Sequence, residues 1–285
     1  MKRRSFVKLA AGSAAAWSAG SAVWGAANPY PGANDRLRVA IIGIHGHGFA
    51  HLREFSSIPG VEVAALCDID ESLFASRVKW LEDNGKPGPA TFTDLRKLYE
   101  DGSIDAVSIV TPNHWHTPAA IWALQAGKHV TVEKPCCHTF REGQLLVEAA
   151  RRSGKVVQHG TESRTNPVYQ RGMEFMRKGG LGEVYLAKGL CYKWRDTIGR
   201  ARPEPVPEGV HYDLWVGPAP MKPFTRNRFH YNWHWQWDYG NGDMGNQGVH
   251  EMDIARWGLG VDLPTRITAT GGHFMFDDDQ SVFEK

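Results

Sequence analysis

Short apolar runs alternate with longer amphipathic segments between Leu37 and about residue 160. The runs read LRVAII, VEVAALC, DAVSIV, HVTVEK and KVVQHG. Because these runs lack the polar alternation of a strand with one wet face, they predict strands of a sheet covered on both faces. Strands and helices in alternation predict an α/β fold class, with a Rossmann-type, doubly wound and mostly parallel sheet over residues 37–160.

The pattern changes after residue 160. NPVYQRGMEFMRKGGLG predicts a helix closed by glycine, EVYLAKGLCYKW and PTRITATGGHFMF predict strands, and VHEMDIARWGLG predicts a second, shorter helix. A long stretch rich in proline and tryptophan lies between them. We expect a second, α+β domain over 161–285 with an open, mostly antiparallel sheet. That sheet would stop soon after it begins, as in a fragment of a longer protein.

The first strand runs into a glycine turn, LRVAIIGIHGHG. Gly43 and Gly48 fit the first and third positions of the dinucleotide fingerprint, whereas His45 holds the second and Gly46 follows it. A diphosphate meets mainly backbone N–H groups at a helix N-terminus, so His45 need not prevent binding. The turn, His47 included, is therefore a candidate cofactor site.

An acidic residue ends the second strand, VEVAALCD. Asp68 stands 25 residues after Gly43, near the spacing at which a carboxylate meets the ribose hydroxyls of a dinucleotide. It would repel a 2′-phosphate, so it favours NAD over NADP. The alternative is a turn residue or a cap for a helix starting at Glu71.

Composition and charge favour small-molecule partners. Of 285 residues, 42% are hydrophobic and 22% charged, and 33 basic residues against 31 acidic ones leave a net charge of +2. This balance gives no electrostatic case for nucleic acid or for an anionic membrane. Four cysteines lack metal-binding spacing, and we predict no metal site: Cys67, Cys136, Cys137 and Cys191.

The N-terminus reads KRRSFVKLAAGSAAAWSAGSAVWGAA. Consecutive Arg3 and Arg4, then Phe6, precede a weakly apolar stretch with no acidic residue until Asp35. This pattern predicts a twin-arginine export signal over 1–27, a linker over 28–36, and a periplasmic or otherwise exported mature protein without a stable membrane span. An ordinary basic N-terminus and a transmembrane anchor are the alternatives.

The segment TPNHWHTPAAIWALQAGKHVTVEKP, Thr111 to Pro135, resembles the middle of the Gfo/Idh/MocA oxidoreductases, the family of glucose-fructose oxidoreductase and inositol dehydrogenase. A weaker resemblance extends through GNQGVHEMDIARWGLG. It implies a nicotinamide cofactor on the first domain and a sugar or cyclitol between the domains. The catalytic lysine of the family falls on Lys134 and its histidine on His250, while its aspartate falls on Asn246, which cannot carry a proton.

The residues themselves agree with this resemblance. Lys134 ends a strand, where open α/β sheets bind ligands, and a desolvated amine there could accept a hydroxyl proton. A surface lysine is the alternative. His250 lies one helical turn before Asp253, so the two could pair, and a structural histidine is its alternative. Further cofactor contacts are expected from the resembling segment: Thr111, Pro112, Asn113, His116 and Glu133.

The stretch RFHYNWHWQWDYGNGDMGNQG is unusually aromatic. Flat rings stack on pyranose faces while amide and carboxylate groups bind hydroxyls, so it predicts a carbohydrate platform. An aromatic loop buried against the sheet or a sister subunit is an equal alternative. The substrate residues that we predict are Arg164, Trp233, Trp235, Trp237, Tyr239, Asn246 and His250.

Together these features predict an NAD-dependent oxidoreductase that transfers hydride to and from a sugar or sugar derivative, as a homo-oligomer through the C-terminal sheet. Because an exported enzyme meets no supply of free cofactor, we expect NAD to stay bound and to be regenerated within the cycle. An NAD-dependent epimerase or glycosidase that uses transient oxidation is an alternative. A non-catalytic sugar-binding protein on the same fold is another.

Overall fold

A computed structural model describes residues 36–282 of the protein. Six parallel strands form one sheet in the order β3-β2-β1-β4-β5-β6, which is the Rossmann order. The strands are β1 Leu37–Ile42, β2 Val61–Cys67, β3 Ala90–Phe92, β4 Ala106–Ile109, β5 His129–Val132 and β6 Val157–His159. The predicted α/β class is confirmed. The predicted export signal lies outside the described residues, as does the predicted linker up to residue 35.

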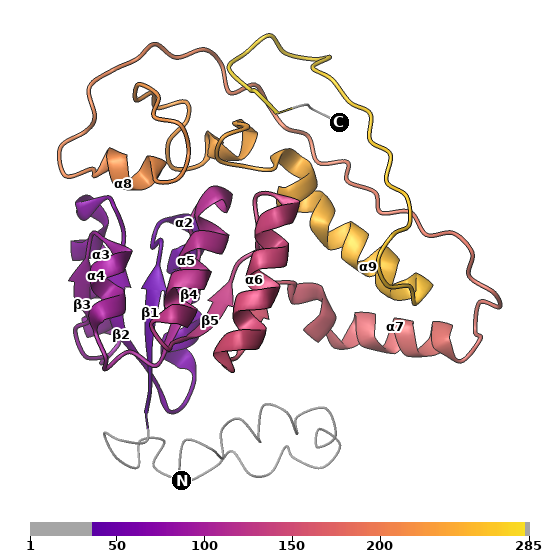
Figure 1. Ribbon diagram of the computed structural model, residues 1–285, viewed down its shortest axis with the longest axis horizontal. Coiled ribbons are helices and arrows are strands. Elements are labelled where there is room, and N and C mark those ends of the chain that lie inside the picture. Colours follow the sequence, from indigo (N-terminus) through magenta and orange to yellow (C-terminus); the bar gives the residue numbers. More distant parts are fainter. Residues whose placement is uncertain (1–35, 283–285) are drawn as a thin grey trace.

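Helices cover both faces of the sheet (Figure 1). Val39 and Ile41 of β1 pack with helices α2 and α3, whereas Ala40 and Ile42 pack with α4, α5 and α6. Successive side chains of a strand point to opposite faces, so a strand buried on both sides must be apolar throughout. The bounds are α2 Gly46–Ser57, η2 Glu71–Leu73, α3 Phe74–Asp83, α4 Leu95–Glu100, α5 Asn113–Gln125 and α6 Phe140–Ser153.

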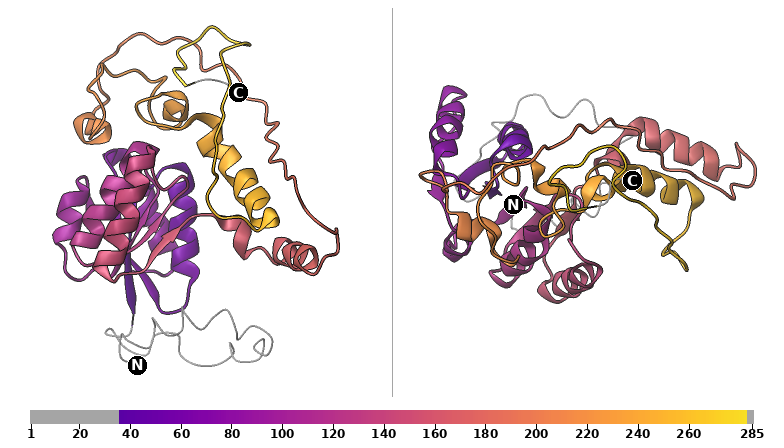
Figure 2. Two further views of the ribbon diagram at one scale, coloured as in Figure 1. Left: turned by 45° about the vertical axis from the view of Figure 1, so that its right-hand side comes forward. Right: turned by 90° about the horizontal axis from the view of Figure 1, so that it is seen from above.

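Beyond β6 the chain forms helices and long extended stretches. The two predicted helices are present as α7, Pro167–Arg177, and α9, Val249–Leu259, with the short turn η3, Glu162–Thr165, before α7. The segments predicted as strands, 183–194 and 264–276, run extended at the outside without forming strands (Figures 1 and 2). A strand requires a neighbour that completes its backbone hydrogen bonds. The expected antiparallel sheet is therefore not formed within the described residues.

Residues 204–245 fold over the carboxyl ends of the strands, and we call them the roof segment. It contains α8 Tyr212–Val216 and η4 Asn232–Trp235, and η5 Met244–Gly248 follows at its end. The roof has its own aromatic core, in which Tyr212 and Trp215 pack with two phenylalanines and Tyr239. Backbone bonds from His211 N to Ile69 O, 2.9 Å, and from Glu71 N to Gly209 O, 3.0 Å, attach it to the end of β2.

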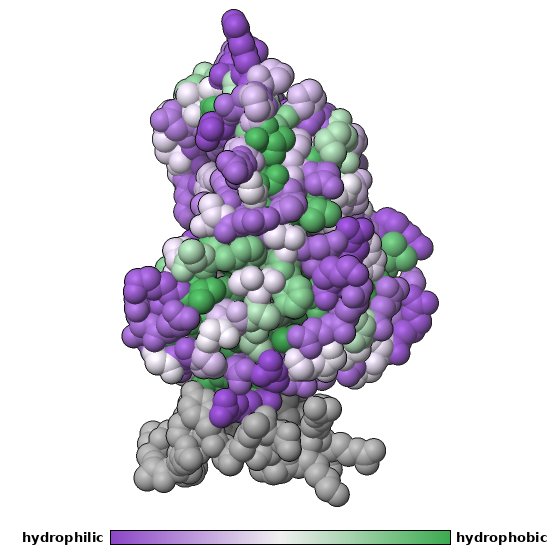
Figure 3. All heavy atoms as spheres, turned by 90° about the vertical axis from the view of Figure 1, so that its left-hand side faces the viewer, coloured by the Kyte–Doolittle hydropathy of each residue, from purple (hydrophilic) through white to green (hydrophobic). Residues whose placement is uncertain are grey.

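The face on the side of β3 is mostly hydrophilic, with smaller apolar groups between the polar residues (Figure 3). Among the described residues, no helix has both the length and the apolar character needed to span a bilayer.

Candidate active site

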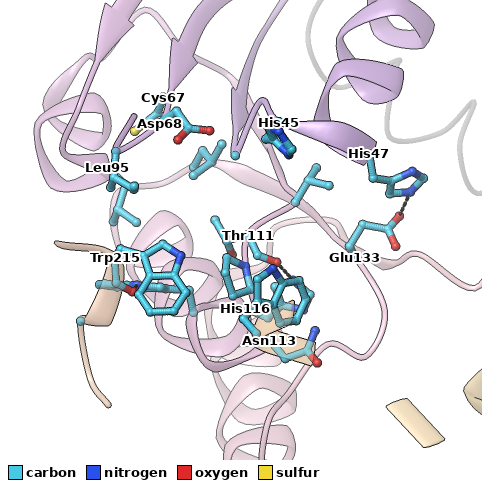
Figure 4. Close-up of a pocket in the computed structure, with 18 of the residues that line it drawn as sticks. His45, His47, Cys67, Asp68, Leu95, Thr111, Asn113, His116, Glu133 and Trp215 are labelled. Atoms are coloured by element: carbon cyan, nitrogen blue, oxygen red, sulfur yellow. Dashed lines mark hydrogen bonds and ion pairs between the residues drawn. The ribbon is translucent and has the colours of Figure 1, made fainter. Parts of the chain in front are cut away.

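A cavity of about 960 Å³ lies between the carboxyl ends of the strands and the roof segment. Open α/β sheets bind ligands at this edge, and the volume suits a large ligand. Figure 4 shows Asp68, His45 and His47 along one side, with Trp215 of the roof opposite Asp68. Every predicted cofactor residue except Gly48 lines it: Gly43, His45, Gly46, His47, Asp68, Thr111, Pro112, Asn113, His116, Glu133 and Lys134.

The glycine turn has the close backbone packing of a dinucleotide site. Gly43 has φ +81°, and a Cβ there would lie 2.7 Å from the carbonyl oxygen of Val110. A Cβ on Gly48 would lie 1.7 Å from the carbonyl oxygen of Gly43, so Gly48 supports the turn from beneath the cavity. Helix α2 starts at Gly46 after an extended His45. Its first N–H groups suit a diphosphate.

Asp68 occupies the position expected for a ribose ligand. Its carboxylate accepts hydrogen bonds from Ile44 N at 2.7 Å and from Asp70 N at 3.1 Å. Burial raises the pKa of Asp68 to about 6, although these backbone donors oppose the rise. The capping role that competed for Asp68 belongs to Asp70, which accepts from Ser72 N. Asp68 is therefore available to a ligand in the cavity.

Asp68→Ala should weaken NAD binding by about 10- to 100-fold at neutral pH, because it removes a hydrogen bond to a charged group. The variant should also discriminate less against NADP. Ribose hydroxyls donate best to the ionised carboxylate, so bound NAD should lower the pKa of Asp68. The affinity of the parent protein should then rise as the pH increases toward the pKa of about 6 and level off above it. Titration calorimetry with both dinucleotides measures this. An Asp68→Asn variant that shows the same rise would assign the titration to another group.

Lys134 and Asn246 meet although 112 residues separate them. Lys134 follows β5, and its Nζ donates to the carbonyl oxygen of Asn246 at 2.7 Å and to its Oδ1 at 3.3 Å. Burial lowers the pKa of Lys134, although Glu133 opposes this. His250, at the start of α9, lines the same cavity. The three predicted catalytic residues thus surround one space.

Glu133 is held by two histidines, of which sequence analysis missed His51. The Nε2 atoms of His47 and His51 lie 3.5 and 3.2 Å from its Oε1. Burial alone would raise the pKa of Glu133, but hydrogen bonds from both rings hold it well below its usual range. One turn of α2 separates the histidines, and that spacing in GHGFAH was the available signal. The Oε2 of Glu133 accepts a hydrogen bond from Lys134 N at 3.0 Å, and this bond orients the lysine.

The same three side chains have ligand atoms within 4.8 Å of one another, a grouping able to hold a metal ion. Sequence spacing had predicted no metal site. Hydrogen bonds satisfy the group without one, because each Nε2–H can donate to Glu133 while His51 Nδ1 accepts from the Ser108 hydroxyl at 2.8 Å. We therefore assign the cluster to the support of Glu133.

The aromatic platform divides into two kinds of ring. Trp233 lines the cavity, as predicted, together with Tyr231 and His234, which the prediction omitted. Tyr239 is fully buried in the roof core, and Trp235 is only 6% exposed. Neither ring lines the cavity, because Tyr239 packs in the roof core and the guanidinium of Arg195 lies over the ring of Trp235. Trp237 is 65% exposed and lies outside the cavity lining.

Arg164 also lies outside the cavity lining. Its guanidinium makes two 2.8 Å hydrogen bonds to the carboxylate of Asp253, and it therefore anchors η3 to α9. The predicted pair of Asp253 with His250 is replaced by this one. Arginine presents two parallel donors that match a carboxylate, which a single imidazole cannot do.

The remaining histidines of the resembling segment are mainly structural. His116 is buried, and its ring nitrogens lie 2.6 Å from Pro135 O and 2.7 Å from Thr111 O, so it fixes the two loops that carry cavity residues. His114 packs against Trp215 and Tyr239, and burial lowers its pKa to about 4. The hydroxyl of Thr111 is buried without a hydrogen-bond partner among the described atoms.

Residues 37–161 match the sequence model of the Gfo/Idh/MocA oxidoreductase family with the NAD-binding Rossmann fold, and residues 182–273 match that of the family's C-terminal alpha/beta domain. A glycosyl hydrolase family 109 protein of Shewanella pealeana is 36% identical over 125 residues, and one of Shewanella sp. strain MR-4 is 38% identical over 123. These alignments cover 42% of this chain and 27% of each relative. The predicted cofactor, NAD, is confirmed by the family match.

Solved structures share the fold. GenD2 of gentamicin A biosynthesis, in complex with NAD, has a TM-score of 0.57 at 23% identity, over 79% of this chain and 54% of its own. The WlbA dehydrogenase of Bordetella pertussis, in complex with NADH and UDP-GlcNAcA, has a TM-score of 0.55 at 21% identity, over 78% and 58%. The chain thus spans about half of each neighbour and about a quarter of the curated relatives.

Proposed function

Because this chain belongs to the Gfo/Idh/MocA family of NAD-binding oxidoreductases, we propose that it oxidises and reduces a sugar or sugar derivative. Within the family, the substrate class rests on the cavity, where Trp233 offers an aromatic face and Asn246 and His250 offer polar groups. Rings and hydroxyl-binding groups together suit a carbohydrate. The alternative of a non-catalytic binder would leave the desolvated lysine in this cavity without a role.

The contact of Lys134 with Asn246 carries the proposal. Bound NAD supplies a hydride acceptor for the carbon that bears the hydroxyl. Lys134 would take the hydroxyl proton on Nζ, and burial favours this role because it lowers the pKa of the amine. Asn246 accepts two hydrogen bonds from that amine and so orients it without competing for the proton. His250 lines the same cavity and is a second candidate to carry the proton.

The test incubates purified protein with NAD and a panel of aldoses, amino sugars and cyclitols, and follows NADH absorbance. A substrate-dependent rise is expected. A protein that binds NAD and sugars, but reduces the cofactor with none of the panel and exchanges no substrate hydrogen with solvent, would be a binder.

Glycoside cleavage through transient oxidation is a second candidate, and the similarity to glycosyl hydrolase family 109 proteins favours it. Oxidation at C3 would acidify the C2 proton, loss of that proton would expel the leaving group, and addition of water and return of the hydride would complete the cycle. Aryl glycosides in deuterated water separate the two candidates. Cleavage with deuterium at C2 of the product supports this route, and NADH accumulation without cleavage supports simple oxidation.

We propose further that the protein is exported by the twin-arginine route with NAD already bound. Replacement of Arg3 and Arg4 by lysines should leave the folded enzyme in the cytoplasm, because the pair is the recognition element of that route. Fractionation and immunoblotting of the parent and the variant measure this. Undiminished export of the variant would assign the N-terminus to another route.

We also propose a homo-oligomer formed through the region after residue 160. Tyr185, Tyr192 and Trp194 follow α7 on one extended stretch and are 87%, 85% and 71% exposed. Large exposed apolar groups gathered in this way favour an interface. Light scattering of the purified protein measures its assembly state.

A further inference from the structure

His45, which replaces the second glycine of the turn, contacts a second histidine. Its ring stacks on that of His230, with centroids 4.4 Å apart and planes inclined by 24°. His45 belongs to the glycine turn and His230 to the roof segment, so the contact joins the two walls of the cavity. Both rings line the cavity and both are partly exposed, which places the stack at its mouth.

His230 is held in position at a conformational cost. It has φ +59°, the only positive φ of a non-glycine residue among those described, and such a backbone costs about 1–2 kcal/mol. Strained residues of this kind persist where the surroundings enforce them, often at ligand clamps. Here the enforcing contacts are a hydrogen bond between Nε2 and Asp70 Oδ2 at 3.1 Å and the packing of the ring on Phe229, at 4.0 Å between centroids.

Asp70 links this contact to the ribose site. Its side chain is only 8% exposed, and its N–H donates to Asp68. The stack, the hydrogen bond between His230 and Asp70, and Asp68 thus form one chain of contacts from the glycine turn, through the roof, to the end of β2. A dinucleotide lying along this edge of the sheet would be enclosed by it.

We propose that the stack of His45 and His230 is a latch, which must open for NAD to enter or leave the cavity. The inference rests on the proposed retention of NAD. A latch slows binding and release together, because the same opening precedes both. It therefore differs from a simple ligand contact, which slows release alone.

The electrostatics allow the rings to stay stacked. Partial burial lowers the pKa of His45, as does the neighbouring Arg77, against the opposing charge of Asp70. Partial burial and His45 lower the pKa of His230, again against Asp70. Both shifts oppose protonation of the rings and so reduce charge repulsion within the stack.

The experiment measures the association and dissociation rates of NADH by stopped-flow fluorescence on the full chain. The variants are His230→Gly, His45→Ala and the double variant. Glycine adopts positive φ without strain, and His45 has an ordinary extended backbone, so both single variants should fold. Each should raise both rates by about 10-fold, the upper value of one aromatic pair. The double variant should be no faster than either single one, since both remove the same contact.

His211→Ala is the matched control. This histidine also joins the roof to the sheet, through Glu71 at 2.7 Å, but it does not line the cavity. Its rates should equal those of the parent. Faster release with unchanged association, additive effects in the double variant, or an equal effect of His211→Ala would each overturn the latch. A parent protein that binds no NADH would instead overturn the proposed function.

Discussion

Lys134→Met should lower the rate of bound-NAD reduction by roughly 10²- to 10⁴-fold, the usual contribution of a general acid or base. Methionine keeps much of the apolar stem but removes the amine that donates to the backbone oxygen and Oδ1 of Asn246. Cofactor should still bind, because the glycine turn and Asp68 are untouched. Pre-steady-state absorbance after mixing with substrate measures the reduction, with NAD occupancy and thermal midpoint determined on the same samples.

A purely structural lysine predicts the opposite pattern. Loss of a packed stem would lower stability, typically by about 0.5–3 kcal/mol, and leave the surviving folded enzyme nearly as fast as the parent. His250→Ala separates the roles further, since Asn246 carries no titratable proton and His250 is a second candidate proton carrier that lines the cavity. Equal reduction rates of parent and Lys134→Met at equal occupancy would remove Lys134 from the chemistry.

Asn246→Asp offers a contrast that keeps the side-chain shape. A carboxylate beside Nζ favours the charged amine, so it should raise the pKa of Lys134. The pH at which reduction reaches half its maximum should move upward relative to the parent. A profile that does not move would show that the titration of Lys134 does not control the reaction.

The parallel sheet and its ligand edge could be predicted because their signals are local. Uninterrupted apolar runs reveal strands buried on both faces, and the carboxyl end of each such strand marks the ligand edge. Asp68 and Lys134 both stand at such ends, and both line the cavity. The meeting of Lys134 with Asn246 followed from a family resemblance and not from any local pattern.

Composition alone could not predict which aromatic rings of the roof are buried and which line the cavity. Its aromatic residues serve either as core or as cavity wall, and the choice depends on how 42 residues close on themselves and on the sheet. Tyr239 and Trp233 are six residues apart, yet Tyr239 is fully buried and Trp233 lines the cavity. Likewise, the sequence shows His45 only as a departure from the glycine motif, because its stacking partner, His230, lies 185 positions later.

The second sheet was expected from a local pattern, but it is not formed within the described residues. EVYLAKGLCYKW has the alternation of a strand, yet alternation records which faces are apolar and not which partner completes the backbone bonds. Just after this stretch, residues 197–201 are held mainly through aspartate side chains, such as Asp278 Oδ2 accepting from Ile198 N at 2.9 Å and Asp279 Oδ2 accepting from Ala201 N at 2.8 Å. Side-chain acceptors complete the hydrogen bonds of backbone N–H groups without pairing the segment with a second strand.

Gly48→Ala should abolish most NAD binding and lower the free energy of unfolding by roughly 1–3 kcal/mol, the usual range for overpacking. An alanine Cβ would lie 1.7 Å from the carbonyl oxygen of Gly43, far inside van der Waals contact. Gly43 has little room to retreat, because the carbonyl oxygen of Val110, at the end of the neighbouring strand β4, lies 2.7 Å from where a Cβ of Gly43 would stand. Relief therefore requires α2 to move away from the turn, and its N-terminal N–H groups would leave the diphosphate.

Gly172→Ala is the matched control, since it also replaces a helical glycine but a Cβ there meets nothing within 4 Å. Without an overlap, alanine should stabilise α7 by about 1 kcal/mol through its helix propensity. Urea unfolding monitored by circular dichroism gives both stability changes, and NADH fluorescence titration gives the affinities. The two alanines should act with opposite sign on stability, and only Gly48→Ala should weaken NADH. If Gly48→Ala instead bound NADH like the parent, the contact between α2 and the glycine turn would not position the diphosphate.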